Sequence, residues 1–357
     1  MNILKNVKYN TIYVTLAVAL IFLIVISAGV GAVHLSIVEI WDILLDGFGI
    51  RHNPEINSIH EGLFFQIRMP RTFMCFIVGA VLSVSGALMQ SLFRNPIVEP
   101  GLVGTSAGAA LGASFMFVFA KIVLFTRLAF LGDLLLPLAA FTGGLIATSI
   151  VYRFSSVFGK VNVSTMILAG IAVNAMAAGG TGFLSYIARD PQARSITFWQ
   201  LGTFSGADYK QVLIVLIIAV LCILISLRFA KQLNALQLGE TEATYLGINI
   251  ERMKIQLILI NTFMVSVATS MVGVIAFVGL VVPHLLRILK GSDNRYLIIG
   301  SALLGAVIMI TVDIVCRIII APAEMPIGII TAFIGGPVFL WLLLKNRKSN
   351  RKGGFYA

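Results

Sequence analysis

The sequence predicts an all-α membrane protein of about ten transmembrane helices with both termini in the cytoplasm, and three observations predict it. Hydrophobic residues make up 59% of the 357 residues and charged residues only 11%, whereas a soluble domain carries roughly 25% charged residues. The apolar residues are gathered in runs close to the roughly 20 residues that a helix needs to cross a bilayer. Basic residues concentrate near both termini and in alternate loops between the runs, and by the positive-inside rule these regions are cytoplasmic.

The apolar runs follow one another along the whole chain. Seven are close to full length, at residues 13–33, 74–92, 134–151, 166–187, 212–227, 255–275 and 297–315. Three are shorter or contain Gly and Pro, at residues 102–119, 274–289 and 327–344. The first run is too long for a removed signal peptide and lacks a cleavage site of small residues. Both termini on one side of the membrane require an even number of spans.

Proline and glycine near polar residues predict interrupted helices at three places, residues 95–100, 282–284 and 322–328. Broken helices at membrane depth are tolerated where they are buried in protein or line a cavity. This pattern favours a transporter or channel over a simple membrane anchor.

No soluble domain is expected, so residues 1–357 form a single transmembrane domain in this interpretation. The best candidate for a nucleotide-binding P-loop, Gly159-Lys160, is followed by Val161 and lacks the upstream glycine that the motif needs. The three cysteines have no CxxC spacing and the four histidines are scattered. We therefore expect no enzymatic activity, no nucleotide-binding domain, no metal and no cofactor. The net charge of +11 is explained by membrane topology rather than by nucleic-acid binding.

Five groups of motifs occur in a fixed order between residue 68 and the C-terminus. They are RMPR at 68–71 with Gln90, RNP at 94–96 and EPG at 99–101; LAG at 168–170; LGETEATYLG at 238–247; GLVVPHLLR at 279–287 with GSDNR at 291–295; and DIVCR at 313–317 with EMPIG at 324–328 and GGP at 335–337. This pattern resembles the iron-chelate and cobalamin (FecCD-type) permeases of ABC importers. The resemblance implies a type II importer permease, similar to the cobalamin permease, in the cytoplasmic (inner) membrane. It further implies a homodimer that works with two ATPase subunits and an extracytoplasmic binding protein.

Three arginines fall at the outer ends of predicted spans, Arg68, Arg71 and Arg317. The resemblance implies that they accept glutamates from the two lobes of the binding protein. The plainer alternative is that their side chains extend to the lipid headgroups, because charges are costly within lipid. Pro70, inside RMPR, argues against a plain helix at this point.

A polar cytoplasmic loop at about residues 231–254 separates two predicted spans. The resemblance implies that it forms two short helices in a cleft of the ATPase, so that ATP-driven closure tilts the spans. An ordinary solvated loop is the alternative. The expected coupling residues are Leu238, Gly239, Glu240, Ala243, Leu246 and Gly247.

The start of the span at 166–187 resembles the inner gate of the pathway, which suggests Ser164, Thr165 and Asn174 as gate residues. For Asn174 the alternative is a hydrogen bond to a neighbouring helix. We expect Asp313 and Glu324 to pair with Arg317 or to cap broken helices rather than to relay protons.

The cargo is the least constrained prediction. EPGL at 99–102 resembles cobalamin and haem permeases, and residues 186–202 resemble haem permeases. Haem is therefore the first choice, followed by a ferric siderophore and then cobalamin. An ion-coupled secondary transporter would need acids in mid-membrane at a repeat interface, and the acids here lie mainly at span ends. A membrane-embedded enzyme would need His, Asp or Ser clustered at one depth, and the sequence shows no such cluster.

Overall fold

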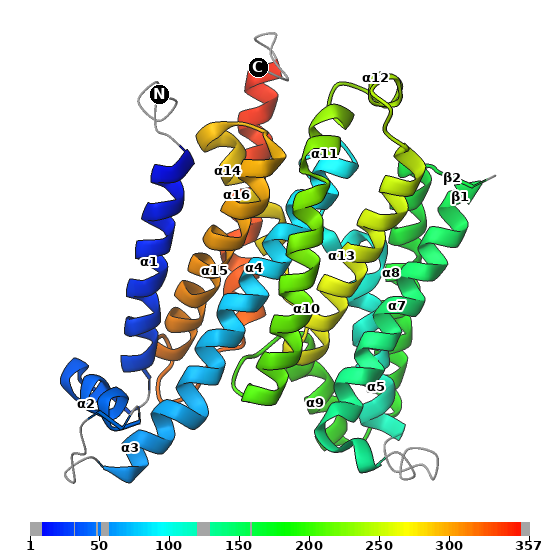
Figure 1. Ribbon diagram of the computed structural model, residues 1–357. Coiled ribbons are helices and arrows are strands. Elements are labelled where there is room, and N and C mark those ends of the chain that lie inside the picture. Colours follow the sequence, from blue (N-terminus) through cyan, green and yellow to red (C-terminus); the bar gives the residue numbers. More distant parts are fainter. Residues whose placement is uncertain are drawn as a thin grey trace.

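The computed structural model describes residues 9–31, 33–47, 49–50, 57–119, 129–157 and 159–350, and they form a bundle of long helices (Figure 1). In order, the elements are α1 (Tyr9–Gly29), α2 (Ile37–Gly47), α3 (Ser58–Gly62), the π-helical turn η2 (Leu63–Arg68), α4 (Met69–Leu92), the 3₁₀ turn η3 (Pro100–Val103), α5 (Thr105–Phe119), the 3₁₀ turn η4 (Ala129–Leu134), α7 (Leu135–Ser155), β1 (Ser156–Val157), β2 (Lys160–Val161), α8 (Val163–Ile187), α9 (Asp190–Gln200), α10 (Tyr209–Arg228), α11 (Ala230–Leu236), α12 (Glu240–Tyr245), α13 (Ile250–Val272), α14 (Val278–Lys290), α15 (Asn294–Ile318) and α16 (Ile327–Asn350).

The long helices confirm the membrane-spanning class. Among the described residues, seven helical stretches are long and apolar enough to cross a membrane; they contain α1, α4, α7, α8, α10, α13 and α15. The three shorter predicted spans correspond to α5, α14 and α16. The start of α1 and the end of α16 lie at the same end of the bundle, together with α11, α12 and the β1–β2 hairpin (Figure 1). We call this end the termini end, and we call the other one, where α2, α3 and α9 lie, the opposite end.

The centre of the bundle is α4, which packs most extensively against α15 and also against α13, α14 and α10. Its residues are almost all buried. Glycines make this close packing possible, because a Cβ at Gly79 would collide with the backbone of Gly305 on α15, and one at Gly86 with the backbone of Gly279 on α14. The glycine-rich sequence therefore serves helix packing here.

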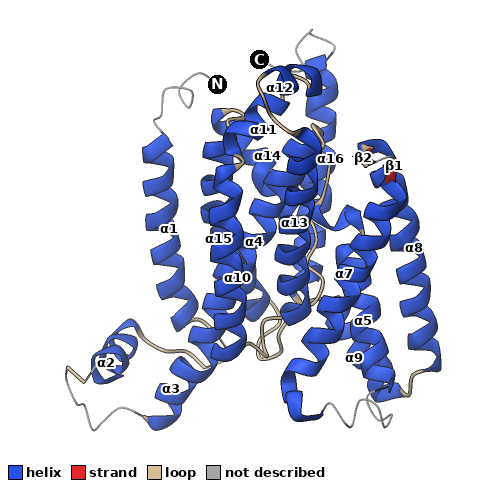
Figure 2. Ribbon diagram, turned by 45° about the vertical axis from the view of Figure 1, so that its right-hand side comes forward, coloured by secondary structure: helices blue, strands red, loops and turns tan. Residues whose placement is uncertain are grey.

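A second group of helices, α5, α7 and α8, packs beside the first, with α13 between the two groups (Figure 2). Gly108 of α5 and Gly143 of α7 face each other so closely that neither has room for a side chain. Nearby, the hydroxyls of Thr105 and Thr148 are hydrogen-bonded at 2.8 Å. The short antiparallel hairpin β1–β2 connects α7 to α8 at the termini end.

One predicted interruption is wrong. Residues 282–284 lie inside α14, and the chain is instead non-helical at 273–277. Pro283 has no N–H to donate to the carbonyl of Gly279, and the side chain of Gln90 compensates by donating to Gly279 O at 3.3 Å and to Leu280 O at 3.1 Å. A helix can therefore continue through this proline.

The other two interruptions are confirmed, since the described chain is irregular before η3 and again between α15 and α16. The non-helical segment at 273–277 is stabilised by Glu99, whose carboxylate accepts a hydrogen bond from the backbone N–H of Phe277 at 3.0 Å. At RMPR the helix is continuous but is not a plain α-helix, because the π-helical turn η2 leads directly into α4 and Pro70 lies two residues after that turn.

Candidate functional site

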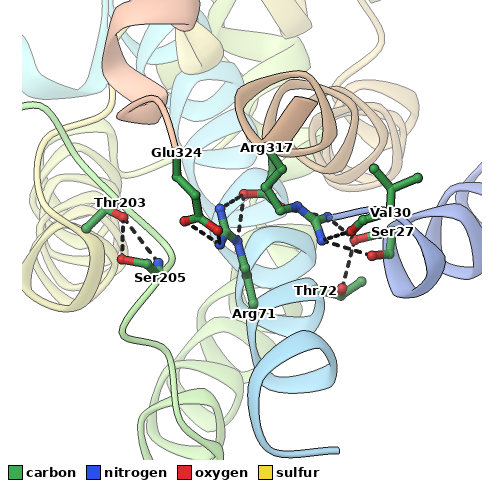
Figure 3. A network of polar contacts seen from close by, with 9 residues as sticks. Ser27, Val30, Arg71, Thr72, Thr203, Ser205, Arg317 and Glu324 are labelled. Carbon is green, nitrogen blue, oxygen red and sulfur yellow. Dashed lines mark hydrogen bonds and ion pairs between the residues drawn. The ribbon is translucent and has the colours of Figure 1, made fainter. Parts of the chain in front are cut away.

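A cluster of four charged side chains lies at the opposite end of the bundle (Figure 3). Arg71, in the first turn of α4, donates from Nε and Nη2 to Asp313 Oδ1 at 3.0 and 2.9 Å. Its Nη1 donates to both carboxylate oxygens of Glu324 at 2.7 Å. Arg71 therefore joins α4 to α15 and to the segment that leads into α16.

Arg317 lies one turn after Asp313 on α15 and completes the cluster. Its Nη2 is 3.0 Å from Asp313 Oδ2 and donates to Ser27 Oγ at 2.6 Å. Its Nη1 donates to the carbonyls of Ser27 and Val30 at 2.9 Å each, which are at the end of α1 (Figure 3). The cluster thus contains two cations and two carboxylates, and their charges balance within one chain.

Arg68, the third predicted docking residue, lies beside this cluster but outside it. Its guanidinium donates to the carbonyls of Ala28 and Val33, where the chain leaves α1. These carbonyls belong to the last turn of a helix and the segment after it, so they have no partner within the helix. Arg68 therefore fixes the exit of α1 against the start of α4.

The burial of the three arginines corrects one expectation. Arg68, Arg71 and Arg317 are only 4–6% exposed and contact their own chain, so the alternative that they extend to the lipid headgroups is wrong.

The predicted pairing of Asp313 with Arg317 is confirmed, whereas Glu324 pairs with Arg71. Docking of a binding protein stays a prediction. Glu324, with a side chain 43% exposed, is the accessible part of the cluster.

The segment between α10 and α13, at the termini end, forms two short helices, α11 and α12, as the resemblance implies. Leu238 and Leu246 flank α12 and are 70% and 65% exposed. Gly239 and Gly247 adopt positive φ angles of 145° and 80°, which only glycine adopts without strain. Ala243 is fully buried and anchors α12. The result is a small projecting helix with exposed apolar residues on both sides.

A buried cation lies directly beneath α12. Lys254 Nζ is 3.1 Å from Glu240 Oε1 of α12 and 3.1 Å from Glu251 Oε1, and it donates to the carbonyl of Val161 in β2 at 3.2 Å. Glu251 accepts the backbone N–H of the same Val161 at 2.8 Å. Sequence reasoning included Glu240 in the candidate site but missed Lys254 and Glu251. The sequence did contain one indication of this contact: Lys254 lies at the edge of an apolar run, where a charged side chain needs a partner.

The predicted gate residues lie where the hairpin enters α8. Asn162 caps the helix, and its side chain accepts the backbone N–H of Thr165 at 3.0 Å. Ser164 is exposed beside it. Asn174 lies further along α8, and its buried Oδ1 has no hydrogen-bond partner among the described residues. The alternative of a hydrogen bond from a neighbouring helix to this oxygen is therefore not observed.

One face of α8 is open. Its exposed apolar residues include Leu168, Ile171, Met176 and Phe183, and a Cβ added at Gly179 or at Gly182 would meet no atom within 4 Å. Small residues among large apolar ones on a membrane helix are typical of a surface that another helix contacts.

No group of three or more His, Cys, Asp or Glu residues that could hold a metal ion occurs within the part of the chain that the structure describes. The described chain is a bundle of helices long enough to cross a membrane, with a projecting helix pair at one end and a charged cluster at the other. Comparison with known proteins gives its class as the permease subunit of an ABC importer.

The chain belongs to the FecCD transport family, whose model matches residues 19–345. It is 38% identical to the hemin transport system permease protein HmuU of Yersinia pestis over 93% of this chain and 95% of that one. It is 40% identical to the vitamin B12 import system permease protein BtuC of Salmonella typhi over 81% and 85%. A solved metal-chelate type ABC transporter in an inward-facing conformation superposes with a TM-score of 0.80 at 30% identity, covering 94% of this chain and 99% of that one.

These relatives are permease subunits and not enzymes, and they identify the chain as a multi-pass protein of the cytoplasmic (inner) membrane.

Proposed function

We propose that this permease forms, as a homodimer, the translocation pathway of an ATP-driven importer for haem. An extracytoplasmic binding protein delivers the cargo, and two ATPase subunits supply the energy. The observation that carries the proposal is the similarity to a hemin permease along 93% of the chain. The termini end is then cytoplasmic, the number of spans is ten, and residues 1–357 act as one transmembrane domain that contains no nucleotide-binding domain.

The choice of haem over cobalamin rests on coverage rather than on identity. The cobalamin permeases are 40% identical to the chain but match a smaller share of it. The resemblance of residues 186–202 to haem permeases adds to the same choice. A ferric siderophore and cobalamin are the alternatives within the family. Membership of an ABC family removes the support for an ion-coupled secondary transporter.

The open face of α8 supports the homodimer. A span that is mostly uncovered within one chain, with glycines that meet no neighbouring atom, has room for a second helix against it. With α8 at the interface between two copies, Ser164 and Thr165 lie at the cytoplasmic mouth of the pathway. This arrangement is the basis for their proposed role as gate residues, with Asn174 further along the same span.

The two ends of the bundle support the proposed partners. Exposed Leu238 and Leu246 around α12 are suited to enter a cleft of the ATPase, with Gly239 and Gly247 allowing close approach. At the opposite end, Glu324 has a side chain 43% exposed and binds Arg71, whose side chain is 7% exposed. We therefore propose that a carboxylate of the binding protein replaces Glu324 on Arg71, while Arg68 and Arg317 hold the surrounding helices in position.

ATP-dependent uptake into liposomes tests this function. The liposomes contain the chain with its cognate ATPase, and the binding protein is loaded in turn with haem, a ferric siderophore and cobalamin. Uptake of haem alone is the expected result. Uptake of another cargo instead would contradict the choice of haem and leave the importer intact. Liposomes without ATP, and liposomes with an ATPase that cannot hydrolyse it, are the controls, and cargo uptake in either would contradict the ATP-driven mechanism.

A further inference from the structure

The structure contains a continuous polar connection between the segment proposed to contact the ATPase and the start of α8. The two regions are far apart in the sequence, since α12 begins at Glu240 and α8 at Val163. Lys254 lies between them. Lys254 is 3% exposed, and its ammonium group contacts Glu240 on one side and Val161 on the other.

The connection continues from Val161 into α8 through the backbone. Both backbone polar groups of Val161 are held from the α13 side, the carbonyl by Lys254 at 3.2 Å and the N–H by Glu251 at 2.8 Å. The next residue, Asn162, donates its N–H to Ser155 O at 3.0 Å and caps α8 through its side chain. Every step between α12 and the first turn of α8 is therefore an ion pair, a hydrogen bond or a peptide bond.

We propose that Lys254 is a positioning residue that transmits movement of α12 to the cytoplasmic start of α8. This inference rests on the proposed function, in which α12 contacts the ATPase and α8 lines the pathway. Lys254 resists separation from its acids because its side chain is 4% exposed, so its ammonium group would be left buried without a partner or water. Displacement of Glu240 then displaces Lys254 and, with it, Val161 and the cap of α8.

The chain offers matched controls for this connection. Arg252 lies two residues from Lys254 on α13 but is exposed, and Glu242 lies two residues from Glu240 on α12 and is also exposed. Neither takes part in the contacts that join α12, Lys254 and Val161. The variants Lys254→Met and Glu240→Ala therefore interrupt the connection, whereas Arg252→Met and Glu242→Ala make the same chemical changes beside it.

The test measures the distance between nitroxide labels on Ser164→Cys in the two copies of the assembled transporter, with and without ATP. The native cysteines, Cys75, Cys222 and Cys316, are first replaced by alanine. We expect a nucleotide-dependent change of distance in the unmodified background and in both controls. In Lys254→Met the change should be lost and cargo uptake should fall at least tenfold, while ATP hydrolysis and assembly with the ATPase continue. A purely structural role would not separate hydrolysis from gate movement in this way.

Glu240→Ala gives an independent reading if Lys254→Met does not fold, because Glu240 is half-exposed and its removal leaves the buried Lys254 paired with Glu251. We expect the same loss of the distance change. A normal distance change in Lys254→Met or in Glu240→Ala, or an equal loss in the two controls, would overturn the inference alone. An unmodified transporter that shows no nucleotide-dependent change would overturn the proposed function together with it.

Discussion

At each end of the bundle a buried cation contacts two carboxylates, Arg71 at the opposite end and Lys254 at the termini end, and the two arrangements differ in how deeply the carboxylates are buried. Arg71 contacts Asp313, whose side chain is 1% exposed, and Glu324, which is 43% exposed. Lys254 contacts Glu240 and Glu251, which are 48% and 29% exposed. Of these four acids, Asp313 alone is fully buried.

The chemistry of the cations adds to this difference. The planar guanidinium of Arg71 donates in a fixed geometry to both of its acids, and Arg317 binds Asp313 from the other side. The ammonium of Lys254 is a compact charge on a flexible stem. The comparison indicates that the cluster at the opposite end fixes α1, α4 and α15 relative to one another. The less buried contacts at the termini end connect the elements that move in the mechanism we propose.

The largest expected effect is that of Asp313→Asn. It leaves two buried arginines with one remaining carboxylate, and breaking a buried ion pair typically costs about 3–5 kcal/mol. We expect a loss of thermal stability of this order in the purified protein in detergent. Asp190→Asn, at an exposed position in α9, is the matched control. If the two variants are equally stable, the inference that the cluster fixes α1, α4 and α15 relative to one another is wrong.

Gly247→Leu should cost less stability but should affect function strongly. A Cβ at Gly247 meets no atom within 4 Å, so the expected cost is that of a side chain at positive φ, about 1–2 kcal/mol. The leucine side chain would then occupy the surface proposed to contact the ATPase, and co-purification with the ATPase should be lost. Gly49→Leu, at a similar positive φ at the opposite end, is the control and should retain it. Retained association in Gly247→Leu would contradict the proposed contact.

Lys254→Met should destabilise the protein by about 1 kcal/mol, because the two partly exposed acids that it leaves behind, Glu240 and Glu251, can be hydrated. The measurement is the same thermal denaturation as for Asp313→Asn. The comparison between the two ends requires the smaller loss here. Equal losses in the two variants would show that both ends are equally rigid.

Glu324→Gln should have the smallest effect on stability, below about 1 kcal/mol, because Glu324 is partly exposed and Arg71 keeps its bond to Asp313. If a carboxylate of the binding protein replaces Glu324 on Arg71, removing this competing charge should lower the concentration of binding protein that gives half-maximal stimulation of ATP hydrolysis. A higher concentration would contradict the exchange. Replacement of Arg71 itself is a poor test of docking, because it would leave Asp313 buried with only Arg317.

Much of the fold could be predicted from the sequence because hydrophobic run length is a local property. The wrong break at residues 282–284 shows where this reasoning fails. Proline disfavours a helix interior locally, but the carbonyl that Pro283 leaves free is satisfied by Gln90, which lies almost two hundred residues earlier. A side chain from another helix thus decides whether the proline interrupts the helix.

The candidate site divides in the same way. The pairing of Asp313 with Arg317 could be predicted because the two residues lie one turn apart on a helix. The pairing of Arg71 with Asp313 depends on how α4 packs against α15, and the contact of Lys254 with Val161 depends on where the hairpin lies. Neither contact can be recognised from a pattern in the sequence. The sequence shows only a charged residue at the edge of an apolar run, and it does not show which distant residue is its partner.

The central place of α4 has a consequence for how the protein is made. This helix is synthesised early, yet α13, α14 and α15, which enclose it, belong to the last third of the chain. Until they emerge, Ser85, Gln90 and Ser91 have no Asn261, Gly279 or Asn294 to bond. A nascent chain that stops after α10 would therefore hold α4 in lipid with its polar groups unsatisfied, a ready substrate for membrane quality-control proteases. Only completion of the C-terminal third allows α4 to reach its stable place.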